Sequence, residues 1–441
     1  MLSLLKTSLQ HHIDAGIPAG PGIYQITIPW SPGAHVPMLD WLNSSPLYPQ
    51  FYWQDRQGIQ ETAACGQLAV FSQLGQAEAF LAEHGASSSL RLWGLNAFGR
   101  GDGAPESYLF LPRLIWRRER DNHALIINLA SRVSLHADAK ACLAMLETLS
   151  PAQGLRPWSA RLLEAIHLPA KRQWQRLVSL ALDSFAQGAL TKVVLARRTR
   201  LVFDQVLNPA ALMAASRRVN HDCYHFMLAW SPGRAFLGSS PERLYRRRLD
   251  QLDTEALAGT VASQSPTATP EQLADWLMKD DKNQRENLLV VDDICQRLRT
   301  VANSLDVMPP EIVRLRTVQH LRRTIQARLT RVGEASCLSM LQPTAAVAGL
   351  PRAAARDFIA RHEPFDRQWY AGSAGYLSTG QTEFCVSLRC AQLEQQELWL
   401  YAGAGIVVGS DAEEEWREVD NKAAGMRNLL VDGDENPGEV A

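Results

Sequence analysis

The sequence predicts an α+β fold in which antiparallel or mixed sheets are covered by helices. Strand-like and helix-like segments are mixed along the 441 residues, without the strict alternation that is typical of a parallel sheet. Hydrophobic residues make up 46% of the chain, which is enough for a substantial core. A chain of this length can form two or three domains, or one large intertwined sheet structure.

A weak domain boundary is expected at residues 150–159, where proline and glycine cluster between two helical patterns. Residues 1–155 have mixed strand and helix patterns and are expected to contribute to the sheets. Residues 156–431 show more regular elements and are expected to form the second part of the chain. Residues 432–441 are acidic and are expected to be disordered.

Capping residues indicate where several helices start. Asn208 is a good N-cap and is followed by proline, which suits the first helical position. Thr269 and Gln272 form a capping box, and the helix that they start is predicted to run to about Leu305. Ser410 and Glu413 form another capping box, which predicts the start of the last helix.

Charge and cysteine usage limit the class of partner and the compartment. The 45 basic and 46 acidic residues almost balance, so nothing favours nucleic acid or an anionic membrane as a partner. No stretch approaches the roughly 20 apolar residues of a membrane helix. The seven cysteines are scattered, with no CxxC pair, which favours a reduced, cytoplasmic protein.

Acidic residues concentrate in the last helix, in the stretch EEEWREVDNK. Glu415, Glu418 and Lys422 share one face there, because residues three or four apart are neighbours on a helix. Glu286 begins an apolar run in the long helix and is expected near its buried side. All of these residues could simply be solvated. Alternatively, carboxylates from the two helices could hold a hard cation such as Mg²⁺, which also accepts oxygens from an anionic substrate.

The stretch AGAGIVVG, between a predicted strand and the last helix, resembles a dinucleotide-binding turn. A dinucleotide fold needs a further parallel strand and an acidic residue about 20 positions on, and the chain after this helix is too short for them. The dinucleotide interpretation is therefore rejected. Free backbone N–H groups at these glycines would instead suit a carboxylate.

Nine segments occur in one order between Lys192 and Gly425: KVVLAR, FLGSSPERL, EALAGT, DDKNQREN, QPTAAVAGLP, WYAGSAGY, FCVSLR, YAGAGIV and EWREVDNKAAG. Together they resemble the motifs of the chorismate-utilising enzymes, and among these the chain looks most like the menaquinone-pathway isochorismate synthases. The resemblance implies that residues 156–431 form the chorismate-binding catalytic part. The resemblance implies the fold of anthranilate synthase component I, with two large stacked antiparallel sheets and surrounding helices. It also implies chorismate as substrate, Mg²⁺ as cofactor and a site in a cleft between the sheets.

Residue by residue, the resemblance makes Glu286 and Glu418 the metal ligands, with Glu415 acting through water. Many relatives carry an acid where this chain has Asn283, so a fourth acidic contact is not expected. Further positions are expected to contact substrate: Tyr370 and Arg389 for the enolpyruvyl carboxylate, Lys422 and the amides of Gly403, Ala404 and Gly405 for a carboxylate, His320 near the ring hydroxyl, and Thr260 and Ala346 in matching motifs.

The resemblance makes Lys192 the general base and Glu242 the general acid. Addition of water at ring carbon 2 needs a base, and loss of the hydroxyl from carbon 4 needs an acid. Lys192 lies in an apolar strand, where burial disfavours the ammonium form. The acid has to hold its proton near pH 7, which requires desolvation or a neighbouring negative charge. Without the resemblance, Lys192 could be an ordinary strand-end lysine, Glu242 a loop glutamate and His320 a satisfied sheet histidine.

Two positions select the branch of the family. Anthranilate synthases generally have glutamine at the position of Lys192, and the ammonia-using branches have threonine or serine at the position of Ala346. Water as nucleophile is therefore expected, with no amidotransferase subunit. Salicylate synthase and aminodeoxychorismate synthase component I remain alternatives. A noncatalytic subunit is disfavoured because both Lys192 and Glu242 are present.

Overall fold

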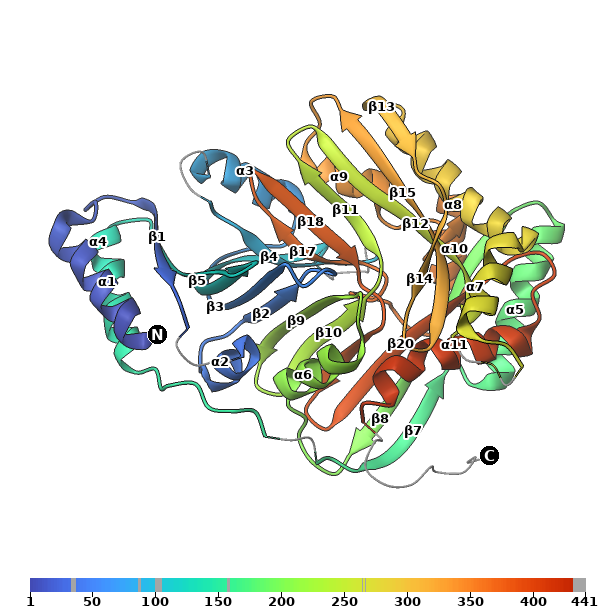
Figure 1. Cartoon of the computed structure of the whole chain (residues 1–441), viewed down its shortest axis with the longest axis horizontal. Coiled ribbons are helices and arrows are strands. Elements are labelled where there is room, and N and C mark those ends of the chain that lie inside the picture. The colour runs from blue at the N-terminus through green and yellow to red at the C-terminus, as the bar shows by residue number, and fades with distance from the viewer. Residues whose placement is uncertain are drawn as a thin grey trace.

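Antiparallel pairing connects the strands of the described structure into one branched sheet (Figure 1). The computed structural model describes residues 1–32, 37–85, 89–99, 105–156, 159–263, 265 and 267–430. Every strand pairing within these ranges is antiparallel, and helices lie outside the sheets, so the predicted α+β fold is confirmed.

The strands form two layers, each with its own pairing order. In the first layer the order is β7 (Leu162–Leu168), β8 (Lys192–Phe203), β20 (Glu397–Ile406), β19 (Cys390–Glu394), β10 (Arg234–Ser240), β9 (Tyr224–Ser231), β2 (Gln50–Gln54), β3 (Gln60–Phe71), β5 (Ser107–Glu119), β6 (Asn122–Ser131) and β1 (Gly22–Trp30). In the second layer it is β4 (Leu92–Asn96), β17 (Ser373–Leu377), β18 (Gln381–Val386), β11 (Arg243–Arg248), β12 (Gln251–Ala262) and β15 (Val318–Leu329), with β13 (Ala302–Val307) and β14 (Glu311–Arg314) both on β15. The short β16 (Gly349–Leu350) pairs with β8.

Strand β5 joins the two layers because its two halves pair with different strands. Residues 107–110 pair with β4 of the second layer, whereas residues 114–119 pair with β6 of the first. Pro112 lies in the gap between the two partners, where its missing N–H costs no ladder hydrogen bond. The layers are therefore one branched sheet rather than two separate ones.

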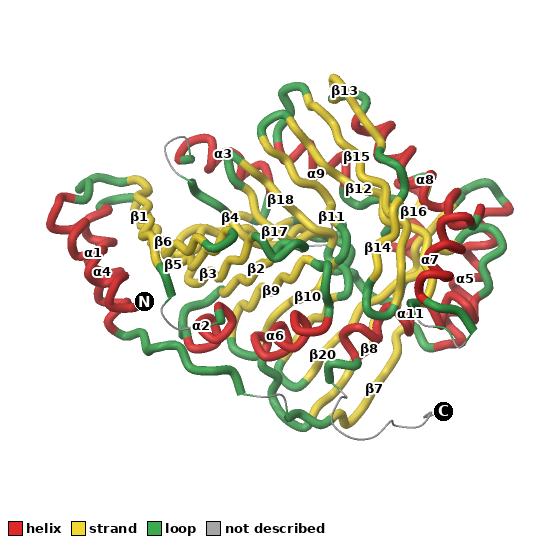
Figure 2. Tube along the Cα trace, viewed as in Figure 1, coloured by secondary structure: helices red, strands yellow, loops and turns green. Residues whose placement is uncertain are grey.

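The helices gather at the ends and on the outer faces of the layers (Figure 2). Helices α5, α7, α8, α10 and α11 lie at one end, and α1 and α4 pack on each other at the opposite end. Their bounds are α1 (Leu2–Gly16), α2 (Met38–Ser44), α3 (Leu74–His84), α4 (Leu135–Glu147), α5 (Lys171–Ala186), α6 (Pro209–Val219), α7 (Pro270–Lys279), α8 (Asp281–Leu298), α9 (Glu334–Leu341), α10 (Arg352–His362) and α11 (Ala412–Arg427).

The predicted caps of α6 and α7 are confirmed, since Asn208 and the Thr269–Gln272 box accept backbone N–H groups as expected. The long helix, however, is broken. Asp280 ends α7 and caps α8 through its side chain, and α8 stops at Leu298 instead of about Leu305.

The cap of α11 also differs from the prediction, because Asp411 rather than Ser410 accepts the first N–H groups of the helix. Asp411 lies one residue closer to the helix, so its carboxylate reaches the amides of Glu413 and Glu414. The Ser410 hydroxyl donates instead to the carboxylate of Glu415.

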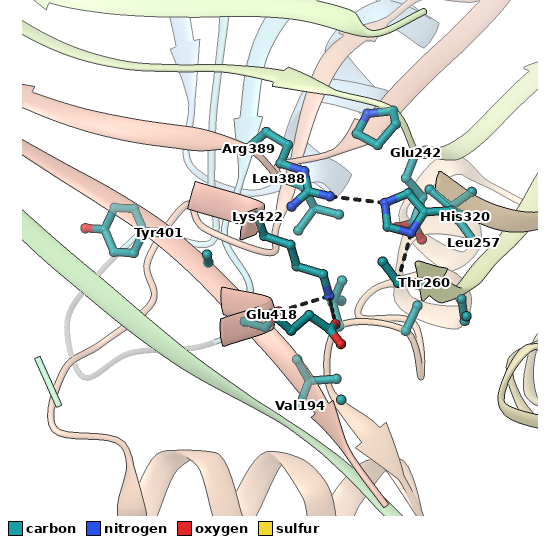
Figure 3. A pocket seen from close by; sticks show the side chains of 18 of the residues that line it. Val194, Glu242, Leu257, Thr260, His320, Leu388, Arg389, Tyr401, Glu418 and Lys422 are labelled. Carbon is teal, nitrogen blue, oxygen red and sulfur yellow. Dashed lines mark hydrogen bonds and ion pairs between the residues drawn. The ribbon is translucent and has the colours of Figure 1, made fainter. Parts of the chain in front are cut away.

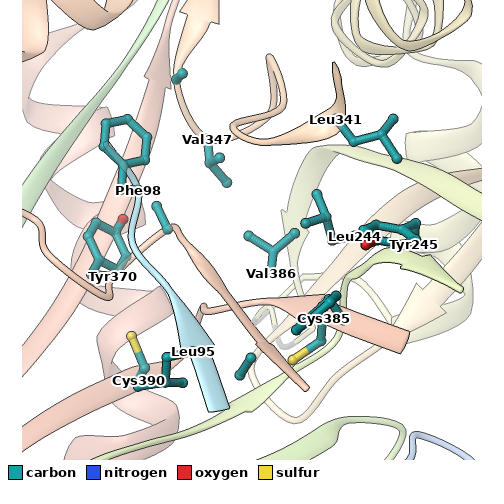
Figure 4. Packing of buried hydrophobic residues seen from close by; sticks show 14 of the residues in the cluster. Leu95, Phe98, Leu244, Tyr245, Leu341, Val347, Tyr370, Cys385, Val386 and Cys390 are labelled. Carbon is teal, nitrogen blue, oxygen red and sulfur yellow. The ribbon is translucent and has the colours of Figure 1, made fainter. Parts of the chain in front are cut away.

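A large hydrophobic core lies between the layers (Figure 4). It combines side chains of the first layer, such as Phe51, with side chains of the second, such as Tyr245 and Val386. Val347 and Tyr370 belong to this core and also border the cavity described below. Packing of the core therefore determines where part of the cavity wall lies.

Strands from both sides of the predicted boundary at residues 150–159 pair directly: β2 with β9, and β4 with β17. The division at residue 155 stays a prediction, and the tail 432–441 lies outside the described residues. No helix in the described ranges combines the length and apolarity that a membrane span requires.

Phe51→Ala tests how strongly the layers depend on each other. The buried ring of Phe51 on β2 lies 5.7 Å, centroid to centroid, from the ring of Trp93 on β4. We expect the substitution to lower the free energy of unfolding by about 3–5 kcal/mol, because it leaves a cavity between the layers. Urea denaturation would measure it, with exposed Val133→Ala as a control expected to change stability by about 0.5 kcal/mol or less. Equal losses in the two variants would contradict the prediction.

Candidate active site

A cavity opens between the end of the β8–β20 pair and the strands β12 and β15, with α8 and α11 along its side (Figure 3). The space that it encloses, including the open mouth, is about 690 Å³. Most of the predicted site residues line it: Glu242, Thr260, Glu286, His320, Ala346, Tyr370, Arg389, Gly403, Gly405, Glu418 and Lys422. Segments far apart in sequence thus meet at one cavity.

Lys192 lies just behind the cavity wall, at the start of β8, and is almost fully buried. Its Nζ donates to Oε1 of Glu286 at 2.9 Å, so an ion pair connects β8 to α8. This pair contributes to a pKa of Glu286 below the ordinary value, although burial itself acts in the opposite direction. Lys192 therefore reaches the cavity through Glu286 in this structure.

Glu415 lies three residues before Glu418 on α11 and, unlike Glu418, is not part of the cavity wall. Burial, followed by the charge of Glu418, raises the pKa of Glu415 to about 7, although the hydroxyl of Ser410 donates to its carboxylate at 2.8 Å. The structure thus places a second carboxyl near Glu418 but outside the cavity wall.

The backbone of β20 explains why Gly403 and Gly405 line the cavity whereas Ala404 does not. Strand β19 pairs only with the first half of β20, up to Tyr401, so one edge of residues 402–406 has no partner among the described strands. Amides alternate between the two sides of an antiparallel strand. The Val194 and Ala196 amides, opposite the two glycines, donate away from β20.

It follows from this alternation that the Ala404 amide is used in the ladder with β8, while the amides of Gly403 and Gly405 face the unpaired edge. Lys422 Nζ donates to the carbonyl of Gly403 on that same edge at 3.2 Å. Two of the three amides expected to bind a carboxylate are therefore available, and the third is not.

Glu242 is buried, lines the cavity, and has an Oε1 atom without a hydrogen-bond partner in the described structure. Burial, followed by the negative charge of Glu255, raises the pKa of Glu242 to about 8, although Lys192 and Lys422 oppose the shift. A carboxyl in this state holds its proton at neutral pH and can donate it.

Arg389, His320 and Thr260 form a hydrogen-bonded row along another part of the wall (Figure 3). Burial and the nearby Arg389 charge hold the pKa of His320 well below its usual value, so the ring is neutral. Arg389 has no acceptor and donates to Nε2 at 3.1 Å, so Nδ1 carries the hydrogen and donates to Thr260 Oγ1 at 2.9 Å. The row fixes the histidine tautomer and the position of the guanidinium.

Many relatives carry an acid at the position of Asn283, whereas here the Asn283 side chain forms structural hydrogen bonds. Its Oδ1 accepts from the amide of Thr260 at 3.0 Å, and its Nδ2 donates to Asp280 at 2.7 Å. Asn283 thus ties α8 to the cavity end of β12 and provides no negative charge.

Glu286 and Glu418 are the carboxylates that could hold a cation. Both face the cavity, and each is paired with a lysine, Lys192 or Lys422. Within the described ranges no three acidic, histidine or cysteine side chains are close enough to form a complete metal site. Mg²⁺ usually takes one or two carboxylates and completes its shell with water and substrate, so this donor set fits Mg²⁺ but not a metal that requires an all-protein cage.

Several wall residues were not singled out from the sequence, namely Val194, Pro241, Leu257, Ala258, Gly259, Val347, Leu388, Tyr401 and Ala402. Many of them lie inside the motifs quoted above, so their position in those motifs was the available signal. Their apolar character gave no chemical reason to select them.

Comparison with known proteins identifies the family of the chain. Residues 99–431 match the family model described as chorismate binding enzyme. The chain belongs to this family. It is 53% identical over 432 residues to the isochorismate synthase MenF of Escherichia coli, covering 97% of this chain and 99% of that protein. It is 39% identical to MenF of Pasteurella multocida, covering 89% of this chain and 90% of the relative.

Solved structures of the family have the same fold. The menaquinone-specific isochorismate synthase MenF of Escherichia coli superimposes with a TM-score of 0.92 at 52% identity, over 97% of this chain and 99% of that one. Anthranilate synthase component I of Streptococcus pneumoniae superimposes with a TM-score of 0.65 at 21% identity, covering 93% of each chain, and supports the fold alone.

Gly403→Ala tests the close packing at the unpaired edge of β20. A Cβ at this position would lie 2.8 Å from the Tyr370 hydroxyl oxygen and 2.9 Å from the carbonyl oxygen of Leu195. The second contact is with backbone, so the strand has to shift, and we expect a loss of about 1–3 kcal/mol in stability. Gly380→Ala is the control, because a Cβ there meets nothing within 4 Å. Chemical denaturation curves with equal midpoints for the two variants would refute this.

Proposed function

We propose that the protein isomerises chorismate to isochorismate, with Mg²⁺ as cofactor, for menaquinone biosynthesis. The observation that carries the proposal is the meeting, at one cavity, of the buried carboxyl of Glu242, the Lys192–Glu286 pair and the carboxylate of Glu418. The raised pKa of Glu242 supports its role as the acid. The identity to MenF over nearly the whole of both chains supports the same assignment.

Chorismate carries two carboxylates, and the cavity offers a separate set of donors for each. Arg389 and Tyr370 would bind the enolpyruvyl carboxylate, since burial raises the pKa of Tyr370 and keeps its hydroxyl a donor. Lys422 and the amides of Gly403 and Gly405 would bind the ring carboxylate. His320 and Thr260 would face the ring hydroxyl as a neutral donor–acceptor pair.

The reaction needs a proton removed from water and a proton given to the leaving hydroxyl. After its ammonium has released a proton, Lys192 accepts the first proton as water attacks ring carbon 2, and the ring double bonds shift. Glu242 donates the second proton to the hydroxyl on carbon 4, which leaves as water. The overall change is an isomerisation, because one water enters and one leaves. Lys192 must give up its proton to solvent, and Glu242 must regain one, before the next turnover.

Glu286 and Glu418 would hold Mg²⁺, with Glu415 acting through water, and the ion would supply positive charge for the ring carboxylate. Glu286 can serve both partners because Lys192 uses only its Oε1 atom. Glu415 does not line the cavity, so it would take part only through such a water.

Water rather than ammonia is the nucleophile in this proposal, and no amidotransferase subunit is required. Ala346 places a methyl group in the cavity wall at the position where ammonia-using relatives have a hydroxyl. The seven cysteines are all free and buried, which supports a reducing, cytoplasmic environment.

The purified protein is expected to convert chorismate to isochorismate when Mg²⁺ is supplied, and Lys192→Ala is expected to lower kcat by a factor on the order of 10²–10⁴. The exposed Lys171→Ala is the matched lysine control and should retain activity. Chromatographic separation of the products would measure both.

Salicylate with pyruvate as products would assign the protein to the salicylate synthases instead. An aminated product formed with ammonia would reject water as the nucleophile. An unchanged rate in Lys192→Ala would remove the general base from the mechanism.

Glu418→Gln is expected to weaken Mg²⁺ binding at least about tenfold, because one of two ligand charges is lost. Calorimetric titration with Mg²⁺, without substrate, would measure this directly. Glu413→Gln on the same helix is the control, because Glu413 is exposed and pairs with Lys171. Equal Mg²⁺ affinity in the two variants would show that Glu418 is not a ligand.

A further inference from the structure

The main chain around Glu242 is held on both sides by one buried ion pair. Nη1 of Arg56 donates to the carbonyl of Pro241, the residue before Glu242, at 2.7 Å. Oε1 of Glu255 accepts from the amide of Arg243, the residue after it, also at 2.7 Å. The two side chains also bind each other, because Nη1 and Nη2 of Arg56 donate to Oε1 and Oε2 of Glu255 at 2.7 and 2.9 Å. Side chains and backbone therefore close a ring around Glu242.

The members of this ring come from distant parts of the chain. Arg56 lies in the turn between β2 and β3, and Glu255 lies on β12 in the second layer. The two side chains are 7% and 1% exposed, and neither lines the cavity. The pair is therefore not placed to bind substrate. Its link to the cavity runs through the backbone on either side of Glu242.

Other contacts around Glu242 complete its support without reaching the carboxyl. The Glu242 carbonyl accepts from the amide of Val386, and its own amide donates to the Ser240 hydroxyl. Arg243 donates through Nε to Tyr224 and Glu383. The backbone of Glu242 is thus fixed, while its Oε1 atom is left without a partner.

Charged groups surround this carboxyl on several elements, and Glu255 is the negative one with the largest effect on its proton affinity. The groups that face it or line the same cavity are Arg56 in the β2–β3 turn, Lys192 on β8, Glu255 on β12, Glu286 on α8, His320 on β15, Arg389 after β18, and Glu418 and Lys422 on α11.

We propose that Arg56 and Glu255 are positioning residues for the proton-donating carboxyl of Glu242. Arg56 fixes the peptide before Glu242 and Glu255 fixes the peptide after it, so the carboxyl is aimed into the cavity. The buried negative charge of Glu255 favours the protonated form of its neighbour. This inference rests on the proposed role of Glu242 as general acid, and it gives residues 1–155 a direct part in the reaction.

Two substitutions separate the two effects. Glu255→Gln keeps the shape and an acceptor for the Arg243 amide but removes the charge. Arg56→Lys keeps a positive charge but loses the bidentate contact. Glu61→Gln is the matched control, because Glu61 is also a buried glutamate paired with arginines, Arg118 and Arg217, and does not touch residues 241–243.

The pH profile of kcat measures the first effect. Wild-type activity is expected to fall as the pH rises through about 8, where Glu242 loses its proton. In Glu255→Gln this alkaline limb is expected to move to lower pH, with a further loss on the order of fivefold at pH 8 and almost none at pH 6, as for a pKa lowered by about one unit.

In Arg56→Lys we expect kcat to fall about tenfold at every pH, with KM changed less than about twofold. The reason is that the acid is misplaced, while it keeps its proton as in the wild type. Glu61→Gln should change neither quantity. A Glu255→Gln profile with the wild-type limb, or full kcat in Arg56→Lys, would overturn the inference. If Glu255→Gln fails to fold, full kcat in Arg56→Lys still overturns it.

Glu242→Gln distinguishes failure of this inference from failure of the proposed function. If Glu242→Gln keeps activity with the same alkaline limb, Glu242 is not the acid and the proposed mechanism fails. If Glu242→Gln loses activity while Glu255→Gln keeps the wild-type limb, only the positioning role fails.

Discussion

Desolvation of charge is the constraint on which the rest of this site depends. A charged side chain taken out of water is costly unless a partner of opposite sign accompanies it. Buried charges around the cavity follow this rule: Lys192 pairs with Glu286, Arg56 with Glu255, and Arg367 with Glu363. Glu242 is the exception among these groups, since its Oε1 atom has no partner in the described structure, and burial raises its pKa to about 8. Desolvation thus favours pairing of the charged groups and favours the neutral form of the unpaired carboxyl.

The branched sheet brings these pairs together. Strand β8 carries Lys192 and pairs with β20, whose last residues have one edge without a partner among the described strands because β19 is too short to cover them. Strand β12 of the second layer carries Thr260, which lines the cavity, and Glu255, which does not. Helices α8 and α11 supply Glu286 and Glu418. Each element contributes one or two groups, and the site exists only where all of them meet.

A second buried pair holds the segment that carries Ala346. Arg367 donates to the carbonyls of Val347 and Val194, and its partner Glu363 accepts from the Ala196 amide. One ion pair therefore ties the Ala346 segment to β8 in the same way that Arg56 and Glu255 tie Glu242 to the second layer. Neither pair lines the cavity, and each binds the backbone of a residue that does, Pro241 for Arg56 and Val347 for Arg367.

The sequence by itself determined the fold class, the family and most of the cavity wall, because these are carried by local patterns and by motifs in a fixed order. It also located the caps of α6 and α7, where the signal lies within four residues. It did not determine the break at Asp280, the cap by Asp411 or the exclusion of Ala404, since each depends on competition between neighbouring groups for the same hydrogen bonds. Only the tertiary structure decided the pairing of Lys192 with Glu286 and of Arg56 with Glu255, because these partners are far apart in the chain and desolvation acts only once the layers have closed over them.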